Sequence, residues 1–70
     1  PEAIRQKKEY FLVKGLIVSG DIEKGLRNPD GARMFYSMAK ITVEKIFDSK
    51  EVREKFQSQN DANLSELSRK

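Results

Sequence analysis

The sequence predicts an all-α domain, a small bundle of three to four helices followed by a polar C-terminal tail. Three observations favour this fold class. Apolar residues recur at helical spacing over 31–47, no second strand-like segment is present to build a sheet, and glycine, proline and Asx residues separate the periodic stretches. With 70 residues, the chain has room for one domain, which we assign to 1–58, with 59–70 as a flexible tail.

The first helix is expected over about 2–18. Residues 10–18, YFLVKGLIV, are apolar almost all round, so periodicity alone leaves a buried helix and a buried strand open. The helix-forming residues before this stretch and the lack of a strand to pair with it favour the helix. The sequence Ser-Gly-Asp that follows predicts a helix end, with Gly20 as a left-handed C-cap and Asp21 as the N-cap of a short helix over 21–28.

The third helix is expected over 30–47 and is the most apolar of the four. It follows the clearest turn in the chain, and either Asn28, with Pro29 at the first helical position, or Asp30 could cap it. Its polar residues fall on one narrow strip, whereas a surface helix normally has an apolar stripe of little more than a third of its circumference. This helix therefore needs cover on two or three sides.

The fourth helix is expected over 49–58. Asp48 and Glu51 fit a capping box that starts a new helix, although one unbroken helix through residue 58 is the alternative. Only Val52 and Phe56 are apolar in it. Beyond residue 57 the sequence is strongly polar and holds too few apolar side chains to offset its ordering cost, so we expect a mobile tail.

Composition argues against an enzyme. The chain contains neither cysteine nor histidine, which removes thiolate chemistry, the commonest general base and the usual transition-metal ligands. No serine, lysine or carboxylate pattern forms a catalytic set. We therefore expect no catalytic, cofactor-binding or metal-binding residues, no cofactor and no small-molecule substrate. No apolar run approaches the roughly 20 residues of a membrane span, so we expect a cytoplasmic protein without membrane contact.

The best functional signal is an excess of apolar side chains. The two main helices are apolar over wide arcs, and the shorter helices offer only two apolar residues each to cover them. Exposed apolar surface usually marks an interface. We expect a regulatory or protein–protein interaction module that forms a homodimer or docks a partner helix. The predicted interface consists of Tyr10, Phe11, Val13, Ile17, Met34, Phe35, Met38 and Ile41.

Nucleic-acid binding is the competing hypothesis. The formal net charge is +3, from 14 basic and 11 acidic residues that are interleaved along most of the chain. A nucleic-acid protein more typically concentrates positive charge on one face. The candidate contacts are the basic residues of the first helix, Arg5, Lys7, Lys8 and Lys14, which a dimer would present twice.

Two short stretches resemble known families. Residues 10–27, with Gly15, Gly20-Asp21 and Glu23-Lys24-Gly25, resemble the turn of a tetratricopeptide-type helical hairpin. The segments 35–37 and 41–48 are similar to parts of the small helical enterobacterial modulators that bind nucleoid-structuring proteins. The first half of the chain does not follow the second pattern, so neither resemblance assigns functional residues.

Overall fold

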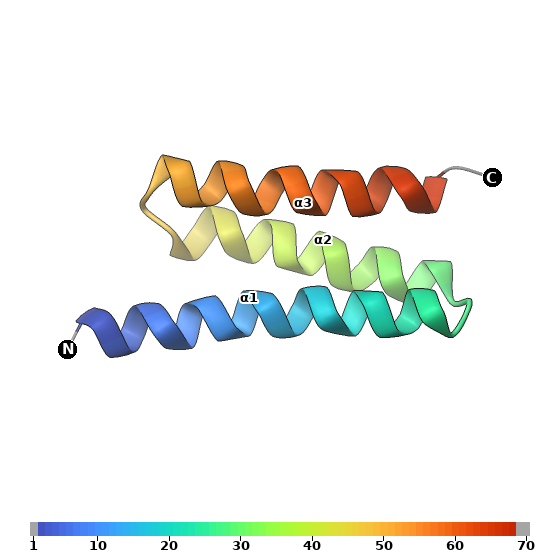
Figure 1. Ribbon diagram of the computed structural model, residues 1–70, viewed down its shortest axis with the longest axis horizontal. Coiled ribbons are helices and arrows are strands. Elements are labelled where there is room, and N and C mark those ends of the chain that lie inside the picture. The colour runs from blue at the N-terminus through green and yellow to red at the C-terminus, as the bar shows by residue number, and fades with distance from the viewer. Residues whose placement is uncertain (1, 69–70) are drawn as a thin grey trace.

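The described part of the chain folds into three α-helices. The computed structural model describes residues 2–68, with side chains from residue 4 onward. The helices are α1 (Glu2–Gly25), α2 (Pro29–Ile46) and α3 (Lys50–Ser68), and they form an elongated antiparallel bundle of 43 × 19 × 13 Å (Figure 1). The predicted all-α fold class is confirmed. Residue 1 of the assigned domain and residues 69–70 of the assigned tail lie outside the described residues.

Helix α1 is continuous where the sequence predicted a break after residue 18. The predicted helices 2–18 and 21–28 are therefore wrong as separate elements, and the resemblance to a helical hairpin fails. Gly20 is buried in the helix, and a Cβ at this position would lie 2.6 Å from the Tyr36 ring of α2. Glycine inside a helix costs about 1 kcal/mol relative to alanine. Here it lets the ring approach the α1 backbone, so close packing offsets the local cost.

The turn between α1 and α2 uses a C-terminal cap and an N-terminal cap in succession. The amide of Asn28 donates to the carbonyl of Glu23, the amide of Arg27 donates to that of Lys24, and Arg27 has a φ of 60°. This is a Schellman-type ending with arginine at the left-handed position. The Asn28 side chain then accepts a hydrogen bond from the Gly31 amide, with Pro29 at the start of α2. Of the two predicted caps, Asn28 is therefore the one observed.

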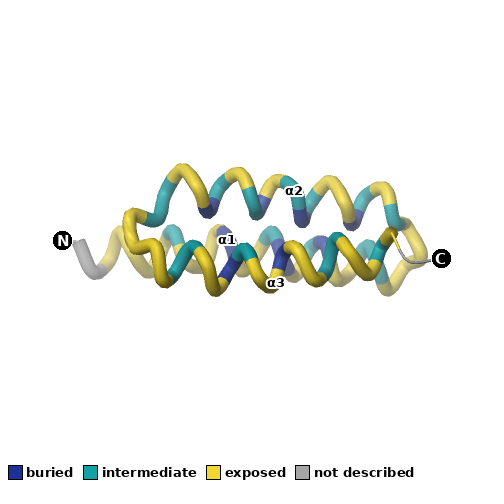
Figure 2. Tube along the Cα trace, turned by 90° about the horizontal axis from the view of Figure 1, so that it is seen from above, coloured by how far each residue is buried: buried dark blue, intermediate teal, exposed yellow. Residues whose placement is uncertain are grey.

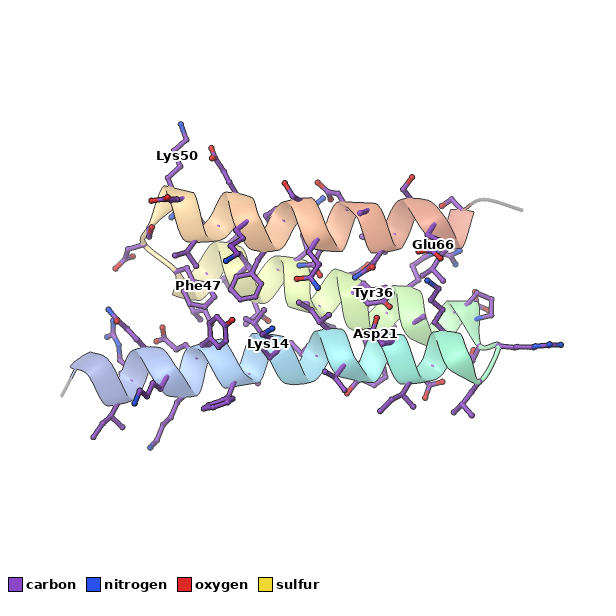
Figure 3. The ribbon with its side chains drawn as sticks, in the orientation of Figure 1. Lys14, Asp21, Tyr36, Phe47, Lys50 and Glu66 are labelled. Carbon is purple, nitrogen blue, oxygen red and sulfur yellow. The ribbon has the colours of Figure 1, made fainter. Side chains whose placement is uncertain are left out.

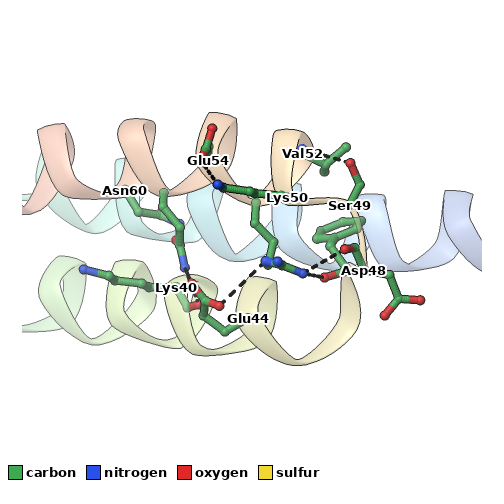
Figure 4. A network of polar contacts seen from close by, with 11 residues as sticks. Lys40, Glu44, Asp48, Ser49, Lys50, Val52, Glu54 and Asn60 are labelled. Carbon is green, nitrogen blue, oxygen red and sulfur yellow. Dashed lines mark hydrogen bonds and ion pairs between the residues drawn. The ribbon is translucent and has the colours of Figure 1, made fainter.

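The turn between α2 and α3 differs in detail from the predicted capping box. The Ser49 hydroxyl, rather than Asp48, accepts a hydrogen bond from the Val52 amide at 3.3 Å, and α3 begins at residue 50. Arg53 donates to the carbonyls of Phe47 and Asp48 at 2.7 and 2.9 Å (Figure 4). These bonds give partners to two carbonyls of the connection that follows α2. The break between the two helices is confirmed, and the cap lies one residue later than predicted.

Helix α3 continues through most of the predicted tail. Residues 59–68 are helical, so a helix ending at residue 58 is wrong. Asn60 is buried, and Leu64 and Leu67 pack against the core. Two ion pairs also tie this half of α3 to the other helices, Lys40–Asp61 at 2.7 Å to α2 and Lys24–Glu66 at 2.6 Å to α1.

The core lies along the line where the three helices meet. Helix α2 supplies more of it than either neighbour, and the buried positions face inward from each helix (Figure 2). The buried apolar residues are Val13 and Ile17 from α1, Ala32, Tyr36, Ala39 and Val43 from α2, and Phe56 from α3.

Candidate interaction surface

Much of the apolar surface lies on the outside of the bundle. Among residues 4–68, ten large hydrophobic residues are exposed, including Phe11 at 71% and Leu26 at 69%. Seven of them belong to α1 or the residue that follows it, and the other three belong to α2. None of the ten lies on α3. In the described part of the chain, the exposed large hydrophobic residues therefore lie on α1, directly after it, or on α2.

The outer face of α1 carries a continuous apolar line. Ile4, Phe11 and Val18 are seven residues apart, and Ile22 follows four residues later. At 3.6 residues per turn, these four side chains lie within an arc of about 40°. Gly15 lies on the same line, and the amide of Leu26 still donates to the Ile22 carbonyl, which extends the line past the end of α1. We call these six residues, Ile4, Phe11, Gly15, Val18, Ile22 and Leu26, the α1 stripe.

Helix α2 carries a shorter line of the same kind, Met34, Met38 and Ile41, which we call the α2 stripe. All three side chains are about half exposed. The buried side of α2, which includes Tyr36 and Val43, lies on the opposite side of the helix. The α2 stripe therefore points directly away from the core. It is smaller than the α1 stripe.

The structure divides the eight predicted interface residues into three groups. Val13 and Ile17 lie in the core with 0% and 3% exposure, so their assignment to an interface is wrong. Phe35 is half-buried. The remaining five are exposed: Tyr10, Phe11, Met34, Met38 and Ile41.

The prediction also missed most of the α1 stripe. Four exposed stripe residues, Ile4, Val18, Ile22 and Leu26, are absent from the predicted interface, as is the neighbouring exposed Leu12. The seven-residue spacing of Ile4, Phe11 and Val18 was the available signal. A helix with apolar residues nearly all round does not reveal from its own sequence which side the rest of the chain covers.

Tyr10 belongs to the seam between α1 and α3 rather than to the α1 stripe. Its ring lies 5.4 Å from that of Phe56, which in turn stacks on Phe47. The Lys14 ammonium lies 5.5 Å from the centre of the Tyr10 ring, a cation–π arrangement (Figure 3). A cleft of about 260 Å³ opens here between α1 and α3, with Val52 and Lys55 among its lining residues. The contact between the Tyr10 and Phe56 rings joins α1 to α3 beside this cleft.

The predicted nucleic-acid contacts do not gather into one basic face. Arg5 pairs with Glu9 at 3.4 Å, and Lys14 lies over Tyr10. Lys7 and Lys8 are exposed, and they lie on opposite sides of the α1 stripe. The positive charge on α1 therefore borders an apolar line.

Tyr36 and Asp21 form a part-buried polar contact between α1 and α2. The Tyr36 ring is fully buried, and its hydroxyl donates to the Asp21 carboxylate (Figure 3). Burial, together with the hydrogen bond to this carboxylate, raises the pKa of the Tyr36 hydroxyl above its ordinary value of 10. The hydroxyl is therefore held protonated as a hydrogen-bond donor, and its role here is to join two helices.

Comparison with known proteins adds no family assignment. No family model, curated protein or solved structure matched the chain. Among residues 2–68, no helix is both long and apolar enough to cross a bilayer, and no acidic cluster is placed to hold a metal ion. The functional argument therefore rests on the two stripes.

Proposed function

We propose that this domain is a non-enzymatic interaction module that binds a helix of another protein chain. The observation that carries the proposal is the α1 stripe, whose large side chains lie on the outer face of a helix that already contributes Val13 and Ile17 to the core. Scattered exposed hydrophobic residues are ordinary, but a contiguous line at helical spacing is typical of a docking face. The partner is either a second copy of the chain or a different protein.

Two contrasts within the molecule support this function. Helix α3 is as long as α2 but exposes no large hydrophobic residue in its described part, so exposure is not a general property of this small bundle. The two Met residues of the α2 stripe also suit a contact surface, since methionine side chains adapt their shape to a partner.

An environment-sensitive apolar dye tests the proposal on dilute protein. The wild-type chain should bind the dye in its folded state. Phe11→Gln with Ile22→Gln should lower the fluorescence by on the order of one fifth or more, because the two residues are a fifth of the exposed large hydrophobic residues and lie within the α1 stripe. The matched control is Ser58→Gln with Gln59→Ala on exposed positions of α3, which should leave dye binding unchanged. A folded wild-type chain that binds no dye and stays monomeric at high concentration would refute the proposal.

Nucleic-acid binding remains a second candidate, supported by the exposed Lys7 and Lys8 on α1. It predicts binding to DNA or RNA that weakens steeply with salt and is lost in Lys7→Glu with Lys8→Glu. Lys45→Glu, an exposed lysine on α2, is the control and should change binding much less. If the wild-type chain shows no binding at low salt, this candidate is discarded.

A further inference from the structure

We propose that the α1 stripe is covered by a second copy of this chain, whose α1 packs antiparallel across Gly15. The inference rests on the proposed function and names its partner. It concerns the α1 stripe alone and leaves the α2 stripe available.

No contact within one chain explains why residue 15 is a glycine. Nothing lies within 4 Å of a Cβ built at this position, whereas Gly20 is required by the Tyr36 ring. Its φ is also negative, as for every described glycine, so its backbone conformation does not call for glycine. A glycine inside a helix destabilises the helix, and at residue 15 of the monomer neither a close contact nor a positive φ compensates for that loss. Its cost is explained if another backbone approaches there.

The position of Gly15 fits a two-fold axis. It lies at the middle of the α1 stripe, eleven residues from Ile4 and eleven from Leu26. A two-fold axis at Gly15 would place Ile4 of each copy beside Leu26 of the other, and Lys8 beside Ile22. Such an isologous contact uses the same surface on both chains. Glycine at the centre lets the helix axes come closer than the usual 8–10 Å.

The charges beside the stripe favour the antiparallel direction. Lys7 and Lys8 lie in the first half of α1, and Asp21 and Glu23 lie in the second half. With the axis at Gly15, Lys7 would lie near Asp21 of the second copy on one flank, and Lys8 near its Glu23 on the other. Within its own chain each of these carboxylates also accepts one hydrogen bond, from Tyr36 and from Asn28 respectively. A parallel pair in register would instead bring like charges together, which is unfavourable. Lys14 lies closest to the axis, where its ammonium is held over the Tyr10 ring of its own chain.

The available apolar area is about three quarters of one side of a standard interface. The five large side chains of the stripe and the adjacent Leu12 are each 51–71% exposed. Together they offer on the order of 600 Å² of apolar surface per chain, since large side chains each expose roughly 200 Å² when extended. The flanking lysine stems add to this. A standard interface buries about 800 Å² on each side.

Sedimentation equilibrium of the whole chain and its Gly15→Gln variant tests the crossing point. The wild type should form a dimer, and Gly15→Gln should weaken it about tenfold or more, because the new side chain separates the helices. The same change should raise the melting temperature of the dilute protein, since it removes a helix-interior glycine without a clash. Loss of association therefore cannot be attributed to misfolding. Gly25→Gln is the matched control, equally open but about 15 Å along the helix, and should weaken the dimer much less.

Disulfide trapping tests whether the two α1 helices pack antiparallel. Because the sequence contains no cysteine, only the introduced cysteines can form a disulfide. Lys8→Cys and Ile22→Cys, oxidised separately, should give little cross-linked dimer, because each residue lies far from its own copy. A mixture of the two should cross-link readily. A parallel pair would give the opposite result, with each variant linking to itself.

The outcomes separate this inference from the proposed function. A wild-type chain that stays monomeric yet binds the apolar dye overturns the second copy as partner and leaves the interaction module intact. A dimer that is unaffected by Gly15→Gln, or that cross-links in the parallel pattern, overturns the geometry. Failure of both dye binding and dimerisation overturns the proposed function as well.

Discussion

At the scale of single residues, Tyr36 shows how a side chain can decide the course of a neighbouring helix. Its ring lies against Gly20, and its hydroxyl donates to Asp21, so two adjacent residues of α1 are explained by one side chain of α2. The same Gly-Asp pair is a common helix boundary, because glycine suits a C-cap and aspartate an N-cap. The local sequence is compatible with both readings, and the Tyr36 contact selects the continuous helix.

The hydroxyl of Tyr36 gives stability a specific dependence on pH. Its pKa is raised in the folded state, by burial first and by Asp21 second. Below about pH 10 the hydroxyl is protonated in both the folded and unfolded states, so its stabilising contribution is fully present. As the pH rises above 10, the unfolded state loses the proton while the folded state keeps it, and the free energy of unfolding falls.

Tyr36→Phe should therefore destabilise the protein most at neutral pH. We expect a loss of about 1–3 kcal/mol in the free energy of unfolding at pH 7, from the hydrogen bond to a carboxylate, while the ring packing on Gly20 is retained. The difference from wild type should shrink between pH 10 and 11. Urea unfolding at several pH values measures it, with the half-exposed Tyr10→Phe as control. A difference that is constant with pH would show that the hydrogen bond is not its source.

At the scale of elements, the second half of α3 shows where composition misleads. The segment after residue 57 looks too polar to fold, yet the spacing of Val52, Phe56, Leu64 and Leu67 continues one helical face. Asn60 fills the gap in that face, where it is fully buried and its Oδ1 has no hydrogen-bond partner. A polar residue at a core position hides the periodicity, so the apolar pattern ends too early when it is read from the sequence.

Leu64 and Leu67 should accordingly contribute to the stability of the whole domain. Replacing both by alanine removes apolar contact with the core and should lower the free energy of unfolding by about 2–4 kcal/mol, less than for two fully buried leucines. Ser65→Ala, an exposed position between them, is the control. Chemical denaturation of the three proteins makes the comparison. Equal midpoints for all three would mean that residues 59–68 behave as the tail predicted from composition.

The sequence predicts elements well where local chemistry is unambiguous. The helix expected over 30–47 is observed as Pro29–Ile46, because an asparagine cap, a proline at the first position and a strongly apolar pattern all agree. Prediction fails at Gly20 and Asn60, where the deciding contact comes from another helix. The candidate surface is likewise decided by contacts with other helices. Val13 and Phe11 are both apolar residues of α1, and only the packing of α2 and α3 buries Val13 and leaves Phe11 exposed.

At the scale of the whole molecule, α2 holds the bundle together. It packs against α1 along one side and against α3 along the other, and it supplies four of the seven buried apolar residues among the described side chains, 4–68. Contact between α1 and α3 is sparser and includes the Tyr10–Phe56 ring pair and the Lys24–Glu66 ion pair. A domain of this size buries only about 60% of the surface that its unfolded chain exposes, less than a larger domain does, and has little stability to spare. The three helices should therefore differ in how easily each one opens.

Hydrogen exchange of backbone amides should reveal this order. Helix α3 exposes polar residues along most of its length and buries only Phe56 and Asn60 fully, so it can detach from α1 and α2 at a smaller cost than global unfolding. We expect amides in α3 to exchange through an opening about 1–2 kcal/mol below that of amides near Ala39 in α2. Phe56→Ala should lower both opening free energies by similar amounts and leave the gap unchanged, because each opening breaks the contacts of this ring with Tyr10 and Phe47. A single opening free energy shared by all three helices would instead show that the bundle unfolds as one unit.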